Sequence, residues 1–457
     1  MEHHGHFPTD RLSRRRFLQT TGAAVGGAML ANPFLAHAAA ERLGNKMRVA
    51  LVGTGVRGVA MFGRDLLRSY GDYVEMVGIC EKNPGRLRVG FDFIGADCPV
   101  FLDLEEMLVQ TKPEWLIVAT WDWEHHNCIE LGMRHGAHII CEKPITIDEV
   151  KAQMILDAQR RYGREVTVTH NYRYPPHRAK VKELLMEGAI GDIISIDLHW
   201  NISHPHLQQY MQRWHGHRER GGSLWVHKAT HHFDLVNWWL DSDPVEVFAY
   251  GDLERFGAQG PFRGENCRNC AFTSECDYHW DITQNEHLYS LYTQNEHHDG
   301  YVRDNCVFRE TIDIFDKHSA VVKYANNAYL SYSLTGEETH EGFWLAVNGT
   351  KGRLEGKEGG VENPTHHEWH LTVRGRGKEV IRMPFERGGH WGGDPLMMDM
   401  LFKDPSGPDP LHQRASARDG IMSILVGTAA RKSIDTGMPV RIEELTELEP
   451  MTSRPRF

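Results

Sequence analysis

The segment Met47–Gly58, which reads M-R-V-A-L-V-G-T-G-V-R-G, constrains the fold more than any other part of the chain. A short aliphatic run leads into a G-x-G-x-x-G pattern, and a helix-like stretch follows. In such a turn the glycines permit a sharp bend, a close approach of the backbone to a diphosphate, and close packing of helix against strand. The first helical N–H groups then face the phosphates. The pattern predicts a dinucleotide site whose candidate contacts are Gly53, Gly55, Val56, Arg57 and Gly58.

From Met47 to about Gly163 the sequence alternates short apolar runs with amphipathic stretches. The runs are apolar throughout rather than at every second position, which is typical of a parallel sheet covered on both faces. We predict strands at Met47–Gly53, Val74–Cys80, Trp115–Val118 and His138–Cys141, and helices that include Val56–Ser69 and His125–His135. This order predicts a doubly wound α/β domain over residues 46–165.

An acidic residue, Glu81, ends the second predicted strand. A carboxylate at that position accepts hydrogen bonds from the ribose hydroxyls of NAD and repels the 2′-phosphate of NADP. Glu81 therefore favours NAD, although the neighbouring Lys82 keeps NADP open.

Two further segments follow predicted strands. Thr120-Trp121-Asp122-Trp123-Glu124-His125 comes after the third strand, and Glu142-Lys143-Pro144 comes after the fourth. Ligands of open α/β sheets bind beyond the carboxyl ends of the strands, so both segments should line the cofactor crevice. A lysine held there can bridge the nicotinamide ribose and a substrate hydroxyl. The candidate contacts are Thr120, His125, Glu142 and Lys143.

Residues 1–38 are typical of an export signal rather than of a folded element. Ser13–Leu18 reads S-R-R-R-F-L, a twin-arginine signature, and a weakly apolar stretch and an A-x-A cleavage site at Ala36–Ala38 follow. We therefore predict a periplasmic protein that is exported already folded, with its cofactor bound. No later segment reaches the roughly 20 apolar residues of a membrane span.

The net charge limits the kinds of partner. The chain carries −11, and because residues 1–38 contribute +2, the remaining residues carry −13. A strongly acidic protein of this kind is not expected to bind nucleic acid or anionic membranes.

The length of 457 residues allows two domains. The second, predicted over residues 166–445, has strands of alternating polarity such as Ile193–Leu198, Ala320–Tyr324 and Ala328–Ser333, and a terminal helix at Ser416–Ser433.

With these motifs in order, the chain resembles the Gfo/Idh/MocA oxidoreductase family. The segments that carry the resemblance are V-G-T-G-V-R-G, Thr120–His125, C-E-K-P at Cys141–Pro144, N-Y-R-Y at Asn171–Tyr174, E-G-A-I-G-D-I at Glu187–Ile193, and G-G-S-L-W-V-H-K-A-T-H-H-F-D at Gly221–Asp234. The resemblance implies a Rossmann domain followed by an α/β domain whose largely antiparallel sheet walls the substrate site and often forms a subunit interface. A homo-oligomer and NAD(P)-linked chemistry on a sugar or polyol are therefore expected.

The resemblance also implies site residues. Lys143 matches the family's active-site lysine, and His231 matches the histidine of its G-G-x-x-x-x-D-x-x-x-H-x-x-D pattern. The family's frequent aspartate falls here on His227, followed by Lys228, which indicates a branch with a different acid/base set.

The residue types themselves suit proton transfer. We predict that one helix begins near His227 and that His227 and His231 share its face, with Lys228 beside His231. A histidine can take the hydroxyl proton when hydride leaves the carbon, and a nearby lysine lowers its pKa. We assign His231 as general acid/base, Lys143 as the group that orients the hydroxyl, Lys228 as an electrostatic aid, and His227 as a substrate contact or second base. H-x-x-x-H is also metal-ligand spacing, but no third ligand is identifiable.

A polar insertion, Leu253–Phe308, contains C-x-x-C-x5-C followed by one more cysteine. Four thiolates complete a tetrahedral set, so we predict a structural zinc site; two disulfides, an iron–sulfur cluster and free thiols remain open. The four ligands would be Cys267, Cys270, Cys276 and Cys306. The cysteines outside the insertion, Cys80, Cys98, Cys128 and Cys141, are expected to be buried apolar residues. The tyrosines Tyr289, Tyr292 and Tyr301 of the insertion suit either a cover over a sugar or a solvated loop.

Two functions fit this sequence. The first is an oxidoreductase that acts on a sugar, sugar derivative or cyclitol with a tightly bound NAD. The second is an NAD-dependent glycoside hydrolase that oxidises a ring hydroxyl, eliminates the leaving group and then reduces the product, because a few relatives of the implied fold work this way. A carbohydrate-binding protein with a structural nucleotide is the non-enzymatic alternative.

Overall fold

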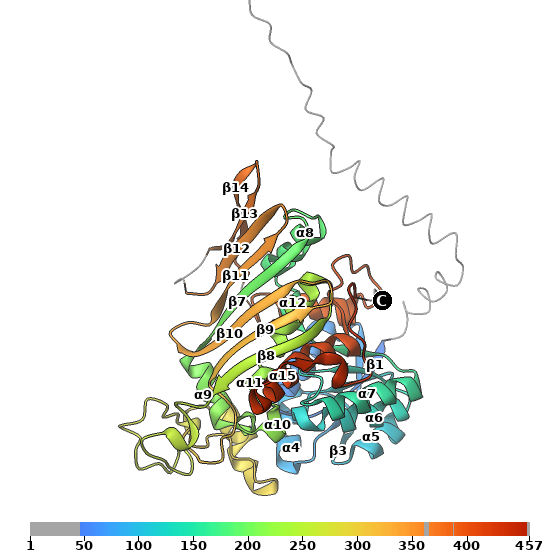
Figure 1. Ribbon diagram of the computed structural model, residues 1–457. Coiled ribbons are helices and arrows are strands. Elements are labelled where there is room, and N and C mark those ends of the chain that lie inside the picture. The colour runs from blue at the N-terminus through green and yellow to red at the C-terminus, as the bar shows by residue number, and fades with distance from the viewer. Residues whose placement is uncertain (1–45, 361–364, 387, 455–457) are drawn as a thin grey trace, which may run out of the picture. The chain divides into compact units, whose positions relative to one another are not determined.

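Two sheets organise the chain. The computed structural model describes residues 46–360, 365–386 and 388–454, and the predicted export signal at 1–38 lies outside these ranges. From Arg48 onward the described residues form one compact unit that contains both sheets and the helices around them (Figure 1).

The first sheet has the order β15-β6-β5-β4-β1-β2-β3. Its strands run parallel except β15, which is antiparallel to β6. Their bounds are β1 Met47–Val52, β2 Val74–Cys80, β3 Val100–Phe101, β4 Trp115–Val118, β5 His138–Cys141, β6 Val166–Val168 and β15 Ala415–Ser416. The central strands are buried on both faces, as expected from their continuous apolar sequences. The predicted doubly wound sheet is confirmed.

Side-chain caps set the ends of the helices that cover this sheet. Asn83, Asp103 and Asp148 each accept a hydrogen bond from a backbone N–H of the first turn. The helices are η1 Gly58–Asp65, α3 Leu66–Tyr70, α4 Pro84–Ile94, α5 Leu104–Thr111, η2 Asp122–Glu124, α6 His125–Arg134 and α7 Glu149–Tyr162. The predicted helix Val56–Ser69 is observed as η1, a π-helix, followed by α3.

The second sheet has the order β14-β13-β12-β11-β7-β10-β9-β8-β16. All its pairs are antiparallel except β7 with β10. The bounds are β7 Ile193–Ser203, β8 Pro244–Asp252, β9 Lys317–Tyr324, β10 Tyr329–Glu338, β11 Gly342–Gly349, β12 Gly352–Glu358, β13 His366–Val373, β14 Gly377–Pro384 and β16 Val440–Arg441. The expected largely antiparallel C-terminal sheet is confirmed.

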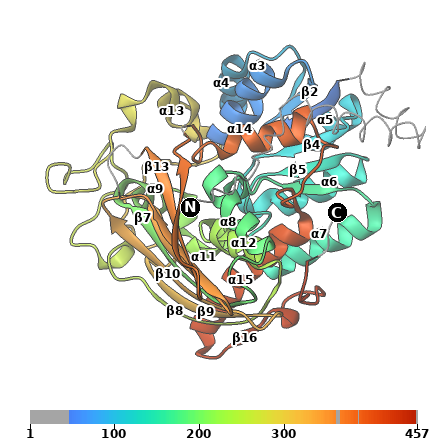
Figure 2. The same ribbon diagram turned by 90° about the horizontal axis from the view of Figure 1, so that it is seen from above.

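Helices fill the space between the two sheets (Figure 2). The long helix α15 (Ala417–Thr436) packs on β8 on one side and on α7 on the other. The remaining helices are η3 Asn171–Arg173, α8 Pro176–Met186, α9 His204–Gln212, η4 Trp214–Gly216, α10 Arg218–Gly221, α11 Leu224–His227, α12 Thr230–Leu240, α14 Gly393–Met398, η8 Asp399–Lys403 and η9 Ile442–Glu444. This layer holds both sheets in one core.

One predicted helix is wrong in its extent. The histidine-rich segment does not form a single helix from His227, because α11 ends at His227 and α12 begins at Thr230. His227 and His231 therefore belong to different helices and do not share a face. All eleven residues of α12 are buried, so its polar side chains need partners inside the protein.

The insertion Leu253–Phe308 contains little regular structure. Its elements are η5 Gly257–Gln259, η6 Ile282–Gln284, α13 Glu286–Leu291 and η7 Thr293–His298. An isolated antiparallel bridge joins Asn266 to Asn305. Both α13 and η7 contact α4, so the insertion reaches back onto the first domain, as Figure 2 shows for α13.

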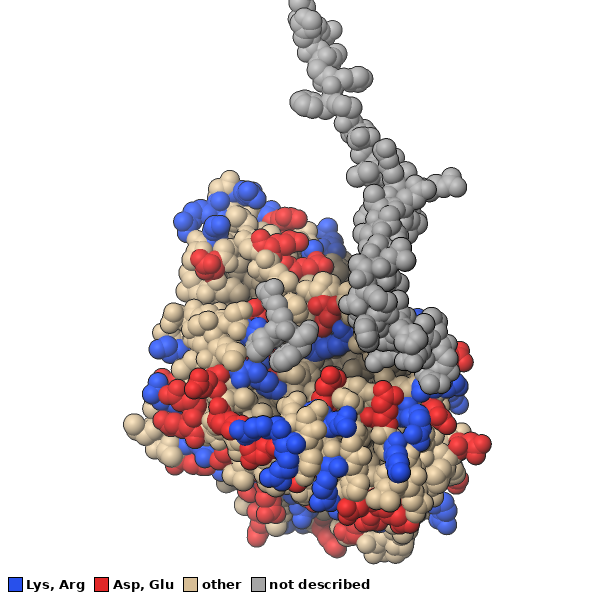
Figure 3. Space-filling model, turned by 90° about the vertical axis from the view of Figure 1, so that its right-hand side faces the viewer, with Lys and Arg blue, Asp and Glu red and all other residues tan. Residues whose placement is uncertain are grey.

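The described surface carries charges of both signs. On the face shown in Figure 3, basic and acidic side chains are interspersed. Within the described ranges, no helix combines the length and the apolar character that crossing a membrane requires.

Candidate active site

The order of strands in the first sheet brings the predicted cofactor contacts onto one edge. Neighbouring strands β2, β1, β4 and β5 run parallel, so their carboxyl ends meet. Glu81 follows β2, the glycine-rich turn follows β1, Thr120 comes after β4, and Glu142 and Lys143 follow β5. We call this row of strand ends the cofactor edge.

The glycine-rich turn has the shape that a dinucleotide needs. Gly53 has φ +99°, and a Cβ there would lie 2.4 Å from the carbonyl oxygen of Ala119. A Cβ on Gly58 would lie 2.0 Å from the carbonyl oxygen of Gly53. Only glycine fits either position, and the backbone is thereby left open to close approach. The turn therefore fits the diphosphate of NAD or NADP.

A tyrosine of the insertion lies directly over this turn. The backbone N–H of Val56 donates to the hydroxyl of Tyr292 at 3.0 Å, and a Cβ on Gly55 would lie 3.3 Å from the same oxygen. The hydroxyl therefore lies against the N-terminal N–H groups that face the diphosphate site. The insertion covers the phosphate end of the cofactor edge.

Both carboxylate oxygens of Glu81 already accept hydrogen bonds from neighbouring groups. One carboxylate oxygen accepts from the backbone N–H of Thr54, and the other from the backbone N–H of Asn83, both at 3.0 Å. Arg86 donates to Glu81 and also pairs with Asp299 of the insertion. A ribose hydroxyl must share this carboxylate with groups that already use its lone pairs.

The turn after β5 is anchored by an ion network. Arg57 donates through Nε to Glu142 at 2.8 Å and through its terminal nitrogens to Asp394. Asp394 also accepts from Asn171 at 2.6 Å. Although burial opposes its charge, hydrogen bonding to His390 and the charge of Arg57 hold the pKa of Asp394 below its usual range. Arg57 and Glu142 thus position the cofactor edge against the C-terminal domain.

Lys143 lies beside a buried acid–histidine pair. Its ammonium donates to the backbone carbonyl of His227 at 3.2 Å. The imidazole Nδ1 of His227 is 2.5 Å from Oδ2 of Asp122, which leaves Nε2 for another partner. His215 completes the cluster, because one ligand atom of each of Asp122, His215 and His227 lies within 4.8 Å of the others.

Burial sets the protonation of these groups. Burial raises the pKa of Asp122 well above its usual value, and burial with the charge of Lys143 lowers that of His227. Burial also lowers the pKa of Lys143 to about 8. Burial therefore favours the uncharged form of both Asp122 and His227 in the resting site.

Three side chains of this site, Asp122, His215 and His227, are of the types that bind metal ions, but positive charges lie next to them. Positive charges on Lys143 and Arg213 bear on both Asp122 and His227. A metal ion there would meet two neighbouring cations. The arrangement suits proton transfer better than metal binding.

His231 and Lys228 lie deeper than His227. The His231 ring stacks on Tyr172 with centroids 3.9 Å apart, and burial together with Lys143 and Lys228 lowers its pKa well below the usual value. This agrees with the predicted effect of a nearby lysine. Lys228 donates to Glu341 at 2.7 Å. The ammonium of Lys228 is buried, whereas the carboxylate of Glu341 is partly exposed.

Other residues of the motifs are structural. Asp234 pairs bidentately with Arg173 at 2.6 and 2.7 Å, and both side chains are buried. His125 is buried with its ring nitrogens 2.9 Å from the carbonyl oxygen of Pro144 and 3.3 Å from that of Thr120. It therefore ties together two segments of the cofactor edge.

Sequence reasoning missed four groups of this site: Asp122, His215, Glu341 and Asp394. Asp122 lies within the strand-end segment that was singled out, so its position was a usable signal. The other three are far from Lys143 in the chain, and no local pattern distinguishes them. The predicted metal ligands Cys267, Cys270, Cys276 and Cys306 line a separate pocket within the insertion.

Comparisons with known proteins agree with this architecture. A family model described as "Oxidoreductase family, NAD-binding Rossmann fold" matches residues 47–170, and one described as "Oxidoreductase family, C-terminal alpha/beta domain" matches residues 182–442.

Two relatives and one solved structure extend the match along the chain. "Putative oxidoreductase YteT" of Bacillus subtilis (strain 168) is 34% identical over 435 residues, covering 88% of this chain and 99% of that protein. "Glycosyl hydrolase family 109 protein 2" of Akkermansia muciniphila is 24% identical, covering 97% of this chain and 98% of that protein. The WlbA dehydrogenase of Bordetella pertussis, solved with NADH and UDP-GlcNAcA, has the same fold with a TM-score of 0.60, 20% identity, and coverage of 87% of this chain and 99% of that chain.

Proposed function

Because the chain belongs to the Gfo/Idh/MocA oxidoreductase family, we propose that it is an NAD-dependent enzyme acting on a hydroxyl-bearing carbon of a sugar, sugar derivative or cyclitol. The observation that carries this proposal is the meeting of Lys143 with the Asp122–His227 pair at the cofactor edge. An imidazole oriented by a carboxylate can accept the hydroxyl proton, and a neighbouring ammonium can stabilise the charge on the oxygen.

Each residue has a distinct role in this proposal. Bound NAD would supply the hydride acceptor. The ammonium of Lys143 holds the reacting hydroxyl and stabilises negative charge on its oxygen. His227 accepts the hydroxyl proton at Nε2, while Asp122 orients the ring through Nδ1 and stabilises the resulting imidazolium. Arg57 and Glu142 position the turn that carries Lys143.

His231 remains the alternative base. It has no carboxylate partner, and its Nδ1 lacks a hydrogen-bond partner among the described residues. Comparing His227→Gln with His231→Gln separates the two assignments. If only His227→Gln loses the pH-dependent limb of turnover, His227 is the base. If only His231→Gln loses it, His231 is the base.

The charges at the far end of the cofactor edge favour NAD over NADP. Glu81 and Asp299 both pair with Arg86. Lys82, the residue that kept NADP open in the sequence, lies 3.6 Å from Glu124, and its side chain is exposed. Two carboxylates there disfavour a 2′-phosphate. The cover formed by Tyr292 supports a cofactor that stays bound through turnover.

The proposal is tested by mass spectrometry of the denatured protein and by a sugar panel. We expect NAD to co-purify, and its absorbance to report reduction when the substrate is added, with an electron acceptor closing the cycle. Absence of nucleotide in the protein, together with no uptake of NAD or NADP in calorimetry, overturns the proposal.

One observation favours a second function. The glycosyl hydrolase family 109 relative aligns over 97% of this chain. Hydrolysis by transient oxidation would return the cofactor unchanged and would need a base for the proton beside the new ketone, a role that His227 could fill. Release of phenol from aryl glycosides without net NADH supports hydrolysis, and NADH formation without phenol release supports the oxidoreductase.

The cellular location and assembly are further parts of the proposal. The S-R-R-R-F-L motif supports export to the periplasm, and fractionation of cells carrying Arg14→Lys with Arg15→Lys tests it.

Large apolar side chains project from the open face of the second sheet, which supports a homo-oligomer built on that face. They are Tyr250, Val321, Tyr329 and Trp344. Light scattering of Val321→Lys against the parent chain tests it.

A further inference from the structure

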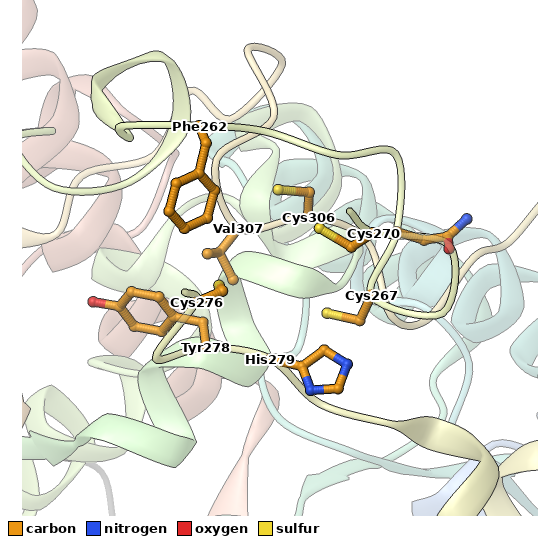
Figure 4. Close-up of a pocket in the computed structure, with 9 residues that line it drawn as sticks. Phe262, Cys267, Cys270, Cys276, Tyr278, His279, Cys306 and Val307 are labelled. Atoms are coloured by element: carbon orange, nitrogen blue, oxygen red, sulfur yellow. The ribbon is translucent and has the colours of Figure 1, made fainter. Parts of the chain in front are cut away.

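Four cysteines of the insertion surround one pocket (Figure 4). Cys267 and Cys306 are brought together by the bridge between Asn266 and Asn305. Cys270 lies one turn after Cys267, and Cys276 comes from the following loop. The sequence predicted that these thiols act together, and the fold places all four around the same space.

The spacing of the sulfurs argues against a single zinc ion. Bonds of about 2.3 Å meeting at tetrahedral angles would place the sulfurs of a zinc site about 3.8 Å apart. Among the described residues, the group of three or more possible ligand atoms that all lie within 4.8 Å of one another is Asp122, His215 and His227, and the cysteines form no such group. In every set of three of these sulfurs, at least one pair is therefore more than 4.8 Å apart, which is wider than the spacing at one zinc ion.

The same geometry argues against disulfides. All eight cysteines of the chain are free thiols, whereas a disulfide needs its sulfurs at about 2.05 Å. The remaining expectations from the sequence are an iron–sulfur cluster and unliganded thiols. A cluster places several iron and sulfide atoms between its cysteines, so it holds their sulfurs further apart than one ion does.

N–H donors surround these sulfurs in the way that metal-bound thiolates need. The backbone N–H groups of Gly264 and Phe308 point to Cys306 at 3.5 and 3.4 Å, and that of Phe272 points to Cys270 at 3.4 Å. The side-chain amide of Gln212 donates to Cys267 at 3.3 Å. Hydrogen bonds to the sulfurs stabilise the negative charge of a cluster and tune its potential.

We propose that Cys267, Cys270, Cys276 and Cys306 ligate an iron–sulfur cluster. Each thiol gives up its proton and binds iron as a thiolate. The cluster holds together an insertion that has little regular structure of its own, and no redox step is assigned to it. Its ligand set admits a [4Fe–4S] or a [2Fe–2S] centre.

The cluster site is linked to the cover over the cofactor edge. Arg268, between two of the ligands, pairs with Glu296 at 2.9 Å and with Asp304 at 2.9 Å. The neighbouring Asn295 accepts from Asn83 at 2.9 Å, next to the N-terminus of α4. A centre at the cysteines therefore stabilises the segment that carries Tyr292.

The test uses the full chain purified without oxygen, with iron, acid-labile sulfide and zinc measured on the same sample. We expect about four iron and four sulfide per chain, or about two of each, together with visible absorption of a cluster. Cys270→Ser and Cys276→Ser should lose most of the iron. Cys98→Ser is the matched control, because Cys98 lies in the first domain and, contrary to the expectation of full burial, is partly exposed.

Three results overturn the proposal: one zinc per chain without iron, disulfides between these cysteines in a thiol count, or iron that persists in both variants. The wild-type metal and sulfide contents decide the matter even if the variants fail to fold. They do not depend on bound nucleotide or on activity, so a failure of the cluster is distinguishable from a failure of the proposed function.

Discussion

The two ends of the cofactor edge are built differently. At the end near β5, Lys143, Asp122 and His227 come from the strand ends and from α11, and they form a small buried cluster of titratable groups. At the end near β2 and β1, the glycine-rich turn is covered by Tyr292, which belongs to the insertion. One end holds the groups for chemistry, and the other holds the groups for retaining the cofactor. Substitutions should therefore separate turnover from cofactor release.

The largest effect is expected from Asp122→Asn. Loss of the carboxylate removes the partner that orients His227 and stabilises its protonated form, so kcat should fall by about 10²–10⁴-fold, the range of a general acid–base group. The dissociation rate of NAD should change little. Steady-state kinetics and nucleotide release from the same sample measure both.

Asp157→Asn is the matched control for Asp122→Asn. Asp157 lies on α7, exposed to solvent, and pairs with Arg160. The separation of the two ends is contradicted if Asp122→Asn keeps its turnover, or if it releases NAD as fast as it loses activity.

The pH dependence of turnover should follow Lys143. Its pKa is lowered to about 8 by burial, so the ammonium that holds the substrate hydroxyl is lost as the pH rises through that value. Turnover should then fall about tenfold for each pH unit above 8. Lys143→Arg keeps the charge and should remove this alkaline limb. A limb that persists in the arginine variant assigns it to another group.

At the covered end, Tyr292→Phe should act on cofactor release. It removes the hydroxyl that accepts from the Val56 N–H and leaves the ring that packs against Tyr301. Loss of one hydrogen bond of about 1 kcal/mol should speed NAD dissociation about fivefold, with kcat unchanged. Stopped-flow displacement of NAD measures this.

Tyr289→Phe controls for a general loosening of the insertion, because Tyr289 lies on α13, which ends directly before Tyr292. Slower NAD release in Tyr292→Phe would instead show that the hydroxyl competes with the diphosphate for the Val56 N–H. That result would reverse the role assigned to the covered end.

The smallest effect is expected from Cys270→Ser on NAD release. If the cluster stabilises the cover only through Arg268 and Asn295, its loss should raise the NAD dissociation rate by a few-fold. Cys98→Ser should release NAD at the wild-type rate. An unchanged rate in a Cys270→Ser protein that has lost its iron would show that the insertion stays in place without the cluster.

Much of the first domain was predictable because its signals are local. β2, β4 and β5 have the bounds expected from their apolar runs, and the glycine-rich turn follows β1 as expected. A strand buried on both faces must be apolar along its length, and a turn that excludes Cβ atoms must use glycine. Such requirements restrict the types of residues that lie close together in the sequence.

The prediction of a single helix through the histidine-rich segment was wrong, because it too used only a local signal. Periodicity connected His227 to His231, but the chain bends between α11 and α12, so His227 turns to Asp122 while His231 stacks on Tyr172. Helical periodicity describes one face of an unbroken helix and cannot show where tertiary contacts interrupt it.

The amino-acid sequence by itself determined the nucleotide-binding sheet, the lysine at its edge and the grouping of four cysteines, because each depends on residue types at short spacing. Only the tertiary structure decided which groups act together: Asp122 with His227, 105 residues apart, and Tyr292 with Val56, 236 residues apart. Packing of the second sheet and the insertion against the first domain brings these pairs into contact, and no local preference of the chain encodes that packing.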